Sequence, residues 1–180
     1  MKKFLIAACM LISFSAAIAQ EGAPQNVIKV NPLGIFFGSA SLGYERAIGP
    51  KSSFVIAPSF GFLKFSGFKY SSFGIGAEYR QYLSKGKSAP AGLYVAPGVG
   101  YTGGSVKVDD GSGSDKTNYS SFTLKGVLGH QWVWDSGFVL DLNGGIQYFS
   151  FSYDEKNGAF SGAKANGIFP ALGLAIGYAF

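Results

Sequence analysis

The last ten residues of the chain, 171–180, read ALGLAIGYAF. A large apolar side chain occupies every second position of this stretch, and only glycine or alanine stands between them. Because successive side chains of a β-strand point to opposite faces, the pattern predicts a strand with one bulky apolar face and one nearly bare face. The bulky positions are Leu172, Leu174, Ile176, Tyr178 and Phe180.

The same period of two recurs along most of the chain. Phe73, Ile75 and Tyr79, for example, alternate with small or charged residues such as Glu78 and Arg80. No segment has the 3.6-residue apolar period of an amphipathic helix, and glycine, proline, serine and aspartate separate the alternating segments. The predicted strands are 27–37, 40–48, 53–65, 70–83, 92–107, 118–134, 137–153 and 167–180.

The composition differs from that of an ordinary soluble domain. Charged residues make up 14% of the chain, where about 25% is usual. Glycine accounts for 27 of the 180 residues and aromatic residues for 16%. Beyond the N-terminal segment, no run of 18 apolar residues is present that would form a membrane-spanning helix. A closed β-barrel is the other structure that satisfies every backbone polar group in lipid.

Two architectures fit the alternation. In a soluble, lipocalin-like barrel the apolar face points inward, whereas in a membrane barrel it points to lipid. We favour the membrane barrel, because the face rich in glycine and poor in charge would make a poor aqueous surface. The predicted fold is therefore an all-β, eight-stranded antiparallel up-and-down transmembrane β-barrel. Aromatic residues near the strand ends fit an interfacial girdle: Trp132, Trp134, Phe138, Tyr82, Tyr178 and Phe180.

The N-terminus has the features of a secretory signal peptide. Lys2 and Lys3 precede an apolar run, and Ala17-Ile18-Ala19 forms a small-x-small cleavage site before Gln20. We therefore predict a cleaved signal peptide at 1–19, a short periplasmic lead at 20–26 and a barrel at 27–180. Removal of the two lysines lowers the formal net charge of +5 by two. Because no dense Lys/Arg cluster is present, nucleic acid is not an expected partner.

The connections between the predicted strands alternate in length. With both termini periplasmic, the connections 49–52, 84–91 and 135–136 are periplasmic, and 38–39, 66–69, 108–117 and 154–166 are extracellular. The two longest connections fall on the extracellular side, as outer-membrane barrels prefer.

Two stretches resemble known outer-membrane proteins. The alternating C-terminal strand, with Tyr178 and Phe180 at its end, resembles the terminal strand of bacterial outer-membrane proteins, which implies recognition by the barrel-assembly machinery. The opening segment Asn26 to Gly34 (NVIKVNPLG), followed by Leu42 to Arg46 (LGYER), resembles a family of small, uncharacterised outer-membrane proteins common in Bacteroidota. In size, eight strands also place the chain beside OmpX and the OmpA membrane domain. These resemblances imply a fold and a location in the cell outer membrane, and no activity.

Five ionisable residues share the face that the membrane barrel would turn inward: Glu45, Glu78, Arg80, Lys125 and Asp141. Charges removed from water need partners, and both signs are present, so we predict an interior polar network that fills the lumen. The alternative is an ion or proton pathway, which we consider less favoured because eight strands leave no open channel.

No part of the sequence predicts an enzyme, a cofactor or a metal site. His130 is the only histidine and lacks a serine two residues on, so a hydrolase-type arrangement is not expected. Gly98 to Gly103 matches G-x-G-x-x-G, but an extended stretch follows where a dinucleotide site requires a helix. The acidic run Asp109 to Asp115 lacks the ligand spacing of a calcium loop.

The predicted function is a structural or surface-interaction role, exerted through the extracellular loops 108–117 and 154–166. Phe160, in an otherwise polar loop, is a candidate contact. The expected partners are outer-membrane lipid, the barrel-assembly machinery and an extracellular ligand or protein. The alternative function is binding or porin-like passage of a small solute, and a third reading is soluble ligand carriage.

Overall fold

The computed structural model describes residues 24–36, 38–65, 67–109, 114–153 and 164–180. The predicted signal peptide at 1–19, most of the lead at 20–26 and Phe160 lie outside these residues. Within the described ranges, no helix is long and apolar enough to cross a membrane.

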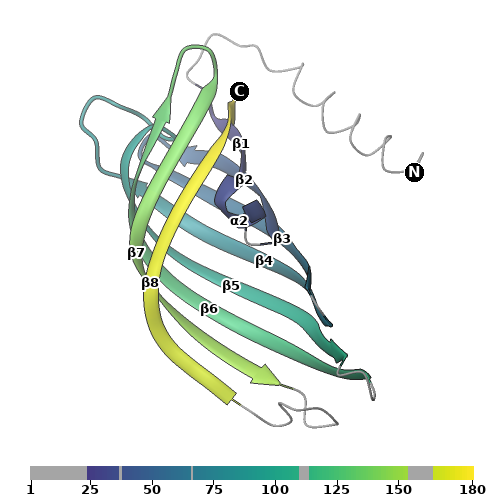
Figure 1. Cartoon of the computed structure of the whole chain (residues 1–180). Helices are drawn as coiled ribbons and strands as arrows, with labels where there is room; N and C mark the ends of the chain where they lie inside the picture. Colours follow the sequence, from purple (N-terminus) through teal and green to yellow (C-terminus); the bar gives the residue numbers. More distant parts are fainter. Residues whose placement is uncertain (1–23, 37, 66, 110–113, 154–163) are drawn as a thin grey trace.

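Eight antiparallel strands follow one another around a closed barrel in sequence order (Figure 1). Each strand pairs with its neighbours in the sequence, and the first pairs with the last. The predicted eight-stranded up-and-down antiparallel barrel is therefore confirmed. The strands are β1 (Asn26–Val30), β2 (Ser39–Gly49), β3 (Ser52–Phe65), β4 (Phe68–Tyr82), β5 (Gly92–Asp109), β6 (Ser114–Val133), β7 (Phe138–Tyr153) and β8 (Lys164–Ala179).

The prediction of one continuous strand over 27–37 is wrong beyond Val30. A short helix, α2 (Pro32–Phe36), follows β1. The side-chain Oδ1 of Asn31 accepts a hydrogen bond from the Gly34 backbone N–H at 3.0 Å, which is the interaction of a helix N-cap. Proline suits the first helical position, because its missing N–H would have no partner there. The strand consequently ends after five residues.

The predicted loop at 108–117 is also too long. β5 and β6 remain paired from Gly92 with Gln131 as far as Asp109 with Ser114, so only 110–113 separates them. The polar residues at the ends of this hairpin satisfy their backbone groups across the strand pair. The other predicted strand limits lie within three residues of the observed ones, and those at Phe65, Gly92 and Tyr153 coincide with them.

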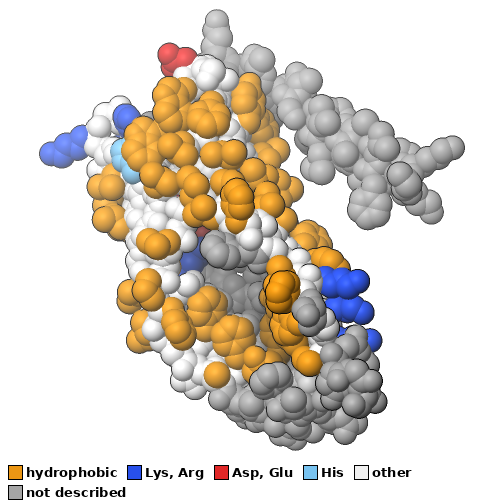
Figure 2. Space-filling model, in the orientation of Figure 1, with side chains coloured by type: hydrophobic (Ala, Val, Ile, Leu, Met, Phe, Trp, Pro, Cys, Tyr) orange, Lys and Arg blue, Asp and Glu red, His pale blue; other side chains and the backbone are white. Residues whose placement is uncertain are grey.

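The two faces of the wall differ in the way that the alternation predicts. Outward-facing side chains include Leu172, which is 85% exposed, and Ile146, which is 63% exposed. Figure 2 shows hydrophobic side chains spread over the visible face of the barrel. Inward-facing positions of β8, by contrast, are occupied by the small residues Ala171, Gly173, Ala175, Gly177 and Ala179.

The two ends of the barrel differ. The terminal end carries Asn26 and Phe180, which exchange backbone hydrogen bonds of 3.0 and 2.9 Å. At the opposite end, which we call the loop end, β3, β5 and β7 finish and β4, β6 and β8 begin (Figure 1). At the terminal end, the connection between β4 and β5 folds inward and buries Ala89 and Pro90. The Ala89 N–H donates to the Pro50 carbonyl at 2.9 Å, which fixes this connection to the turn between β2 and β3.

Because β1 is short, it pairs with β8 only from Val27 with Ala179 to Val30 with Ile176. Toward the loop end, β8 has β7 as its one strand partner within the part of the chain that the structure describes. The helix α2 lies between β2 and β8 at this height and contacts both. We call this part of the wall, between β8 residues 164–175 and α2 with the start of β2, the seam.

Candidate functional site

An ionic cluster occupies the interior near the terminal end, and all five ionisable residues predicted to face inward belong to it. Arg80 is at its centre, and its guanidinium contacts three carboxylates. Nη1 lies 2.6 Å from Asp141 and 3.4 Å from Glu45, and Nη2 lies 3.0 Å from Glu78. These acids come from β7, β2 and β4, so one side chain joins strands on different sides of the barrel.

Lys125 forms the part of the cluster nearest the loop end. Its Nζ lies 2.6 Å from Oε1 of Glu78, which also accepts hydrogen bonds from Arg80 through Oε2. The Lys125 side chain is 30% exposed, whereas those of Glu45 and Asp141 are fully buried. The cluster is thus buried toward the terminal end and partly exposed at Lys125.

Lys29 is a sixth member that the sequence analysis did not name. Its Nζ lies 2.5 Å from Glu45 and 3.0 Å from Asp141, and it donates to Gln131 Oε1 at 2.8 Å. The alternation of side chains along β1 could have identified Lys29 as an inward-facing residue. Ile28 and Val30 are the apolar outward positions of this strand, so Lys29 between them has to point inward.

Neutral groups complete the hydrogen bonding of the buried acids. Tyr82 and Ser53 donate their hydroxyl protons to Glu45 at 2.6 and 2.5 Å, and Tyr94 donates to Asp141 at 2.6 Å. The prediction that Tyr82 belongs to the aromatic girdle is therefore wrong, because its side chain is buried inside the barrel. The Arg80 guanidinium carbon also lies 4.2 Å from the centre of the Tyr94 ring, a cation–π contact.

Gln131 links the cluster to the inward-folded connection between β4 and β5. Its amide Nε2 donates to the Pro90 carbonyl at 2.5 Å. Among the described side chains, no buried nitrogen or oxygen lacks a hydrogen-bond partner. Three cations face three acids, so the formal charges of the cluster balance, and each of its buried polar atoms has a partner. It is a satisfied polar core that fills the terminal end of the lumen.

The lumen contains free space on the loop-end side of the cluster. One cavity of about 230 Å³ is lined by small residues, including Gly76 and Gly100, and by Glu78 and Lys125. A second cavity of about 200 Å³ extends to the seam, where Ser41 and residues 171–175 line it. Both cavities end at the ionic cluster, which therefore forms their floor.

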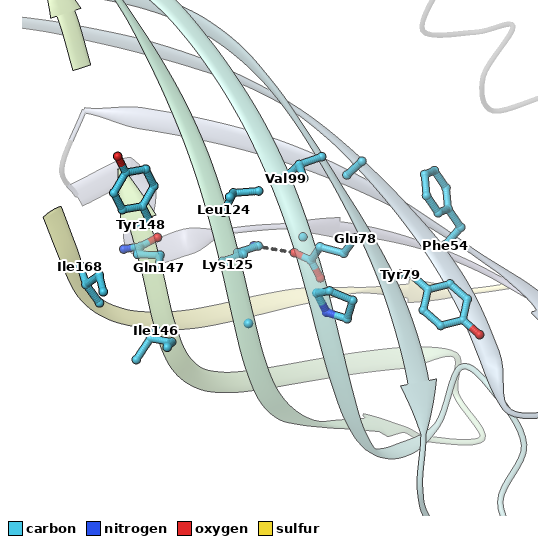
Figure 3. A pocket seen from close by; sticks show the side chains of 14 residues that line it. Phe54, Glu78, Tyr79, Val99, Leu124, Lys125, Ile146, Gln147, Tyr148 and Ile168 are labelled. Atoms are coloured by element: carbon cyan, nitrogen blue, oxygen red, sulfur yellow. Dashed lines mark hydrogen bonds and ion pairs between the residues drawn. The ribbon is translucent and has the colours of Figure 1, made fainter. Parts of the chain in front are cut away.

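A third hollow, of about 470 Å³, is lined mainly by apolar side chains of the outer wall (Figure 3). Leu124, Ile146 and Val99 are among them, and the ion pair of Lys125 with Glu78 is its main polar feature. Its lining suits hydrocarbon better than a polar ligand.

His130 belongs to the outer face and not to the cluster. Its ring packs against Trp132 with 4.3 Å between ring centres, and its cross-strand neighbours are Leu93 and Leu142. In the residues with described positions, no group of three or more His, Cys, Asp or Glu side chains is arranged to hold a metal ion. Gly98 to Gly103 lies within β5, as expected of strand glycines.

The predicted assembly signal lies at the end of β8. Tyr178 is 58% exposed on the outer wall, and Phe180 forms the backbone pair with Asn26 described above. Recognition of these two residues by the assembly machinery stays a prediction.

No family model matches the sequence, and no curated protein matches it significantly. Among solved structures, the chain is similar to the translocator domain of the autotransporter NalP from Neisseria meningitidis. The identity is 19% and the TM-score 0.47, and the match covers 94% of this chain and 67% of that chain. The resemblance of the opening segment to a Bacteroidota family, and the likeness to OmpX and OmpA, stay predictions.

Proposed function

We propose that this protein is an integral barrel of the bacterial outer membrane, with a structural or surface-interaction role at its loop end. The observation that carries the proposal is the orientation of the wall. Bulky apolar side chains face outward around the barrel, while the charges of the ionic cluster are buried inside. A soluble monomer rarely exposes an apolar surface of more than a few hundred Å².

The height of the apolar band supports the same conclusion. On β6 the outward positions from Phe122 to Trp132 are mainly apolar or aromatic, with Leu124 and Leu128 between them. A transmembrane β-strand crosses the hydrocarbon core with about 9–11 residues. Beyond Phe122, toward the loop end, the outward positions are the polar Ser120, Asn118 and Lys116. The band thus has the length of one bilayer crossing.

The filled terminal end argues for a role at the surface. The ionic cluster and the inward-folded connection at Ala89 and Pro90 occupy the lumen there, and eight strands leave little further room. The longest strands, β5 with 18 residues and β6 with 20, continue beyond the apolar band toward the loop end. The surface that this barrel presents outside the membrane therefore includes the β5–β6 hairpin.

Location and orientation are tested together by single cysteines. The only cysteine, Cys9, lies in the predicted signal peptide, so a mature Lys64→Cys or Lys85→Cys variant would carry one thiol. An impermeant maleimide should label Lys64→Cys on intact cells, and Lys85→Cys only after the outer membrane is permeabilised. Heat-modifiable gel migration of the detergent-extracted protein checks the barrel. Recovery in the soluble fraction, or the reverse labelling pattern, contradicts the proposal.

The second candidate function is binding of a small solute inside the barrel. The cavity of about 200 Å³ that borders the seam favours it. Passage through the terminal end would require the ionic cluster to separate, so we expect binding without conduction. In planar bilayers, the reconstituted protein should give no large, stable conductance, and such a conductance would contradict the filled lumen.

A further inference from the structure

Four lysines form a continuous row across the loop end of the wall. Lys64 of β3 pairs in register with Lys69 of β4, Lys69 pairs with Lys107 of β5, and Lys107 pairs with Lys116 of β6. Residues paired in register on adjacent strands point to the same face. We call these four residues the lysine row.

The lysine row is on the outer face. Lys64 lies two residues from Phe62, which is 68% exposed on the wall, and so shares its parity. Lys64 and Lys116, at the two ends of the row, are exposed, and Lys69 and Lys107 also interact within the protein. Figure 2 shows Lys and Arg side chains gathered at one side of the barrel near this end.

Four lysines side by side make this part of the outer face a cationic surface, which attracts anions. Neighbouring strands are about 4.8 Å apart, so three strand intervals spread the charges over about 14 Å. This width exceeds that of a single phosphate group. The spacing therefore suits a ligand that carries more than one anionic group.

On β4, β5 and β6 the next outward positions toward the membrane are polar and uncharged, whereas on β3 that position is Phe62. Ser71 and Ser105 are cross-strand neighbours whose hydroxyl oxygens lie 3.2 Å apart, and Asn118 follows on β6. One step farther, Phe60 and Phe73 pack together with 5.2 Å between ring centres. On β4 to β6 the outward positions thus run from cations through small or polar residues to apolar side chains, and on β3 an apolar side chain follows Lys64 directly.

This order matches the chemistry of an amphiphile with phosphates, a sugar and acyl chains. We propose that the lysine row binds the phosphorylated head group of an anionic glycolipid in the outer leaflet. The inference rests on the proposed outer-membrane location. The apolar band on the membrane side of the lysine row favours a lipid over a free anion, because the acyl chains of a bound lipid would lie along this band.

The test uses the mature barrel in nanodiscs of phosphatidylcholine that contain a small fraction of a bisphosphorylated glucosamine-disaccharide lipid (lipid A). Native mass spectrometry counts the lipid retained by each barrel. The test variant, Lys64→Gln with Lys116→Gln, removes the two exposed ends of the row. The matched control, Lys85→Gln with Lys87→Gln, removes two exposed lysines at the terminal end. A fourfold variant with all row lysines changed to glutamine measures the whole site.

Wild type and the control should retain the bisphosphorylated lipid equally. A lysine near an anionic head group contributes about fivefold to affinity, so the double variant should bind about 25-fold more weakly, and the fourfold variant weaker still. Removing both phosphates from the lipid should lower retention by wild type to the level of the fourfold variant.

Three outcomes overturn the inference: equal retention by wild type and the fourfold variant, an equal loss in the control, or complete displacement of the lipid by millimolar inorganic phosphate. The last would identify a free-anion site. Heat-modifiable migration and flotation with the lipid are measured on the same samples. Normal insertion without lipid retention refutes the inference alone, whereas failure to insert refutes the proposed function.

Discussion

Nη1 of Arg80 lies 2.6 Å from Oδ2 of Asp141, across the barrel interior and 61 residues away in the sequence. The two residues come from β4 and β7, which are not neighbours in the wall. The contact therefore holds the interior together independently of the ladder of backbone hydrogen bonds. Since it depends on the closed barrel, it reports whether the whole chain has folded.

Arg80→Ala should destabilise the barrel strongly. Glu45, Glu78 and Asp141 would lose their shared cation, and breaking one side of a buried ion pair costs about 3–5 kcal/mol. The free energy of unfolding, measured by urea titration in lipid vesicles, checks this. Adding Asp141→Asn should restore part of the stability, because it removes one uncompensated charge. Arg46→Ala, at an exposed position of β2, is the control, and an equal loss there would contradict the account.

Lys29→Met should have an effect of similar size, about 3–5 kcal/mol in unfolding free energy. The lysine contacts both Glu45 and Asp141 from the shortest strand of the barrel. Glu45→Gln in the same chain should recover part of the loss. Lys85 is exposed, so Lys85→Met should leave the unfolding free energy unchanged and serves as the control. If Lys29→Met is neutral as well, β1 does not take part in the ionic cluster.

Strand β6 offers an inward-facing glycine, Gly129, and an outward-facing one, Gly126, which serves as its control. A Cβ added to Gly129 would lie 2.5 Å from the ring of Tyr94, which Asp141 holds in place, whereas one added to Gly126 would meet nothing within 4 Å. Gly129→Ala should therefore destabilise by about 1–3 kcal/mol, the usual effect of overpacking. Gly126→Ala should change the unfolding free energy little. Equal values for the two variants would mean that Tyr94 is not fixed inside the barrel.

A charge on the outer wall should be tolerated poorly. Leu128 is outward-facing near the middle of the apolar band on β6. Leu128→Arg should destabilise the inserted barrel by about 2–4 kcal/mol, as expected for a cation at the bilayer midplane. Ser120→Arg, beyond the band on the same strand, is the control and should cost far less. The comparison is made by urea titration in vesicles, and a larger loss at Ser120 would contradict the proposed depth.

The sequence was sufficient for the strand number and for the inward face, because alternation of large and small residues is a local property. It was also sufficient to place Glu45, Glu78, Arg80, Lys125 and Asp141 together, since their parity sends them into one narrow lumen. It could not assign their pairs. The ion pairs depend on the stagger between strands, which places Arg80 next to Asp141 and Lys125 next to Glu78.

The misjudged segments have physical causes. After Val30, the hydrogen bond from the Gly34 N–H to the Asn31 side chain caps a helix and ends the strand. The alternation of the preceding residues does not reveal this helix. At the β5–β6 hairpin, polar residues such as Lys116 and Thr117 look like loop residues, although their backbones pair. The lysine row could not be predicted from the sequence, because its four lysines become neighbours only through the register of four strands.

Site-directed nitroxide scanning of β5 in reconstituted vesicles tests the orientation of the wall most directly. Single cysteines replace residues 95–101 in turn, and collision rates with oxygen and with a water-soluble nickel chelate are measured. The account predicts a period of two, with oxygen collisions highest at Val95, Val99 and Tyr101 and lowest at Ala96, Gly98 and Gly100. The opposite phase, or high nickel collisions at Val99 and Tyr101, would contradict it.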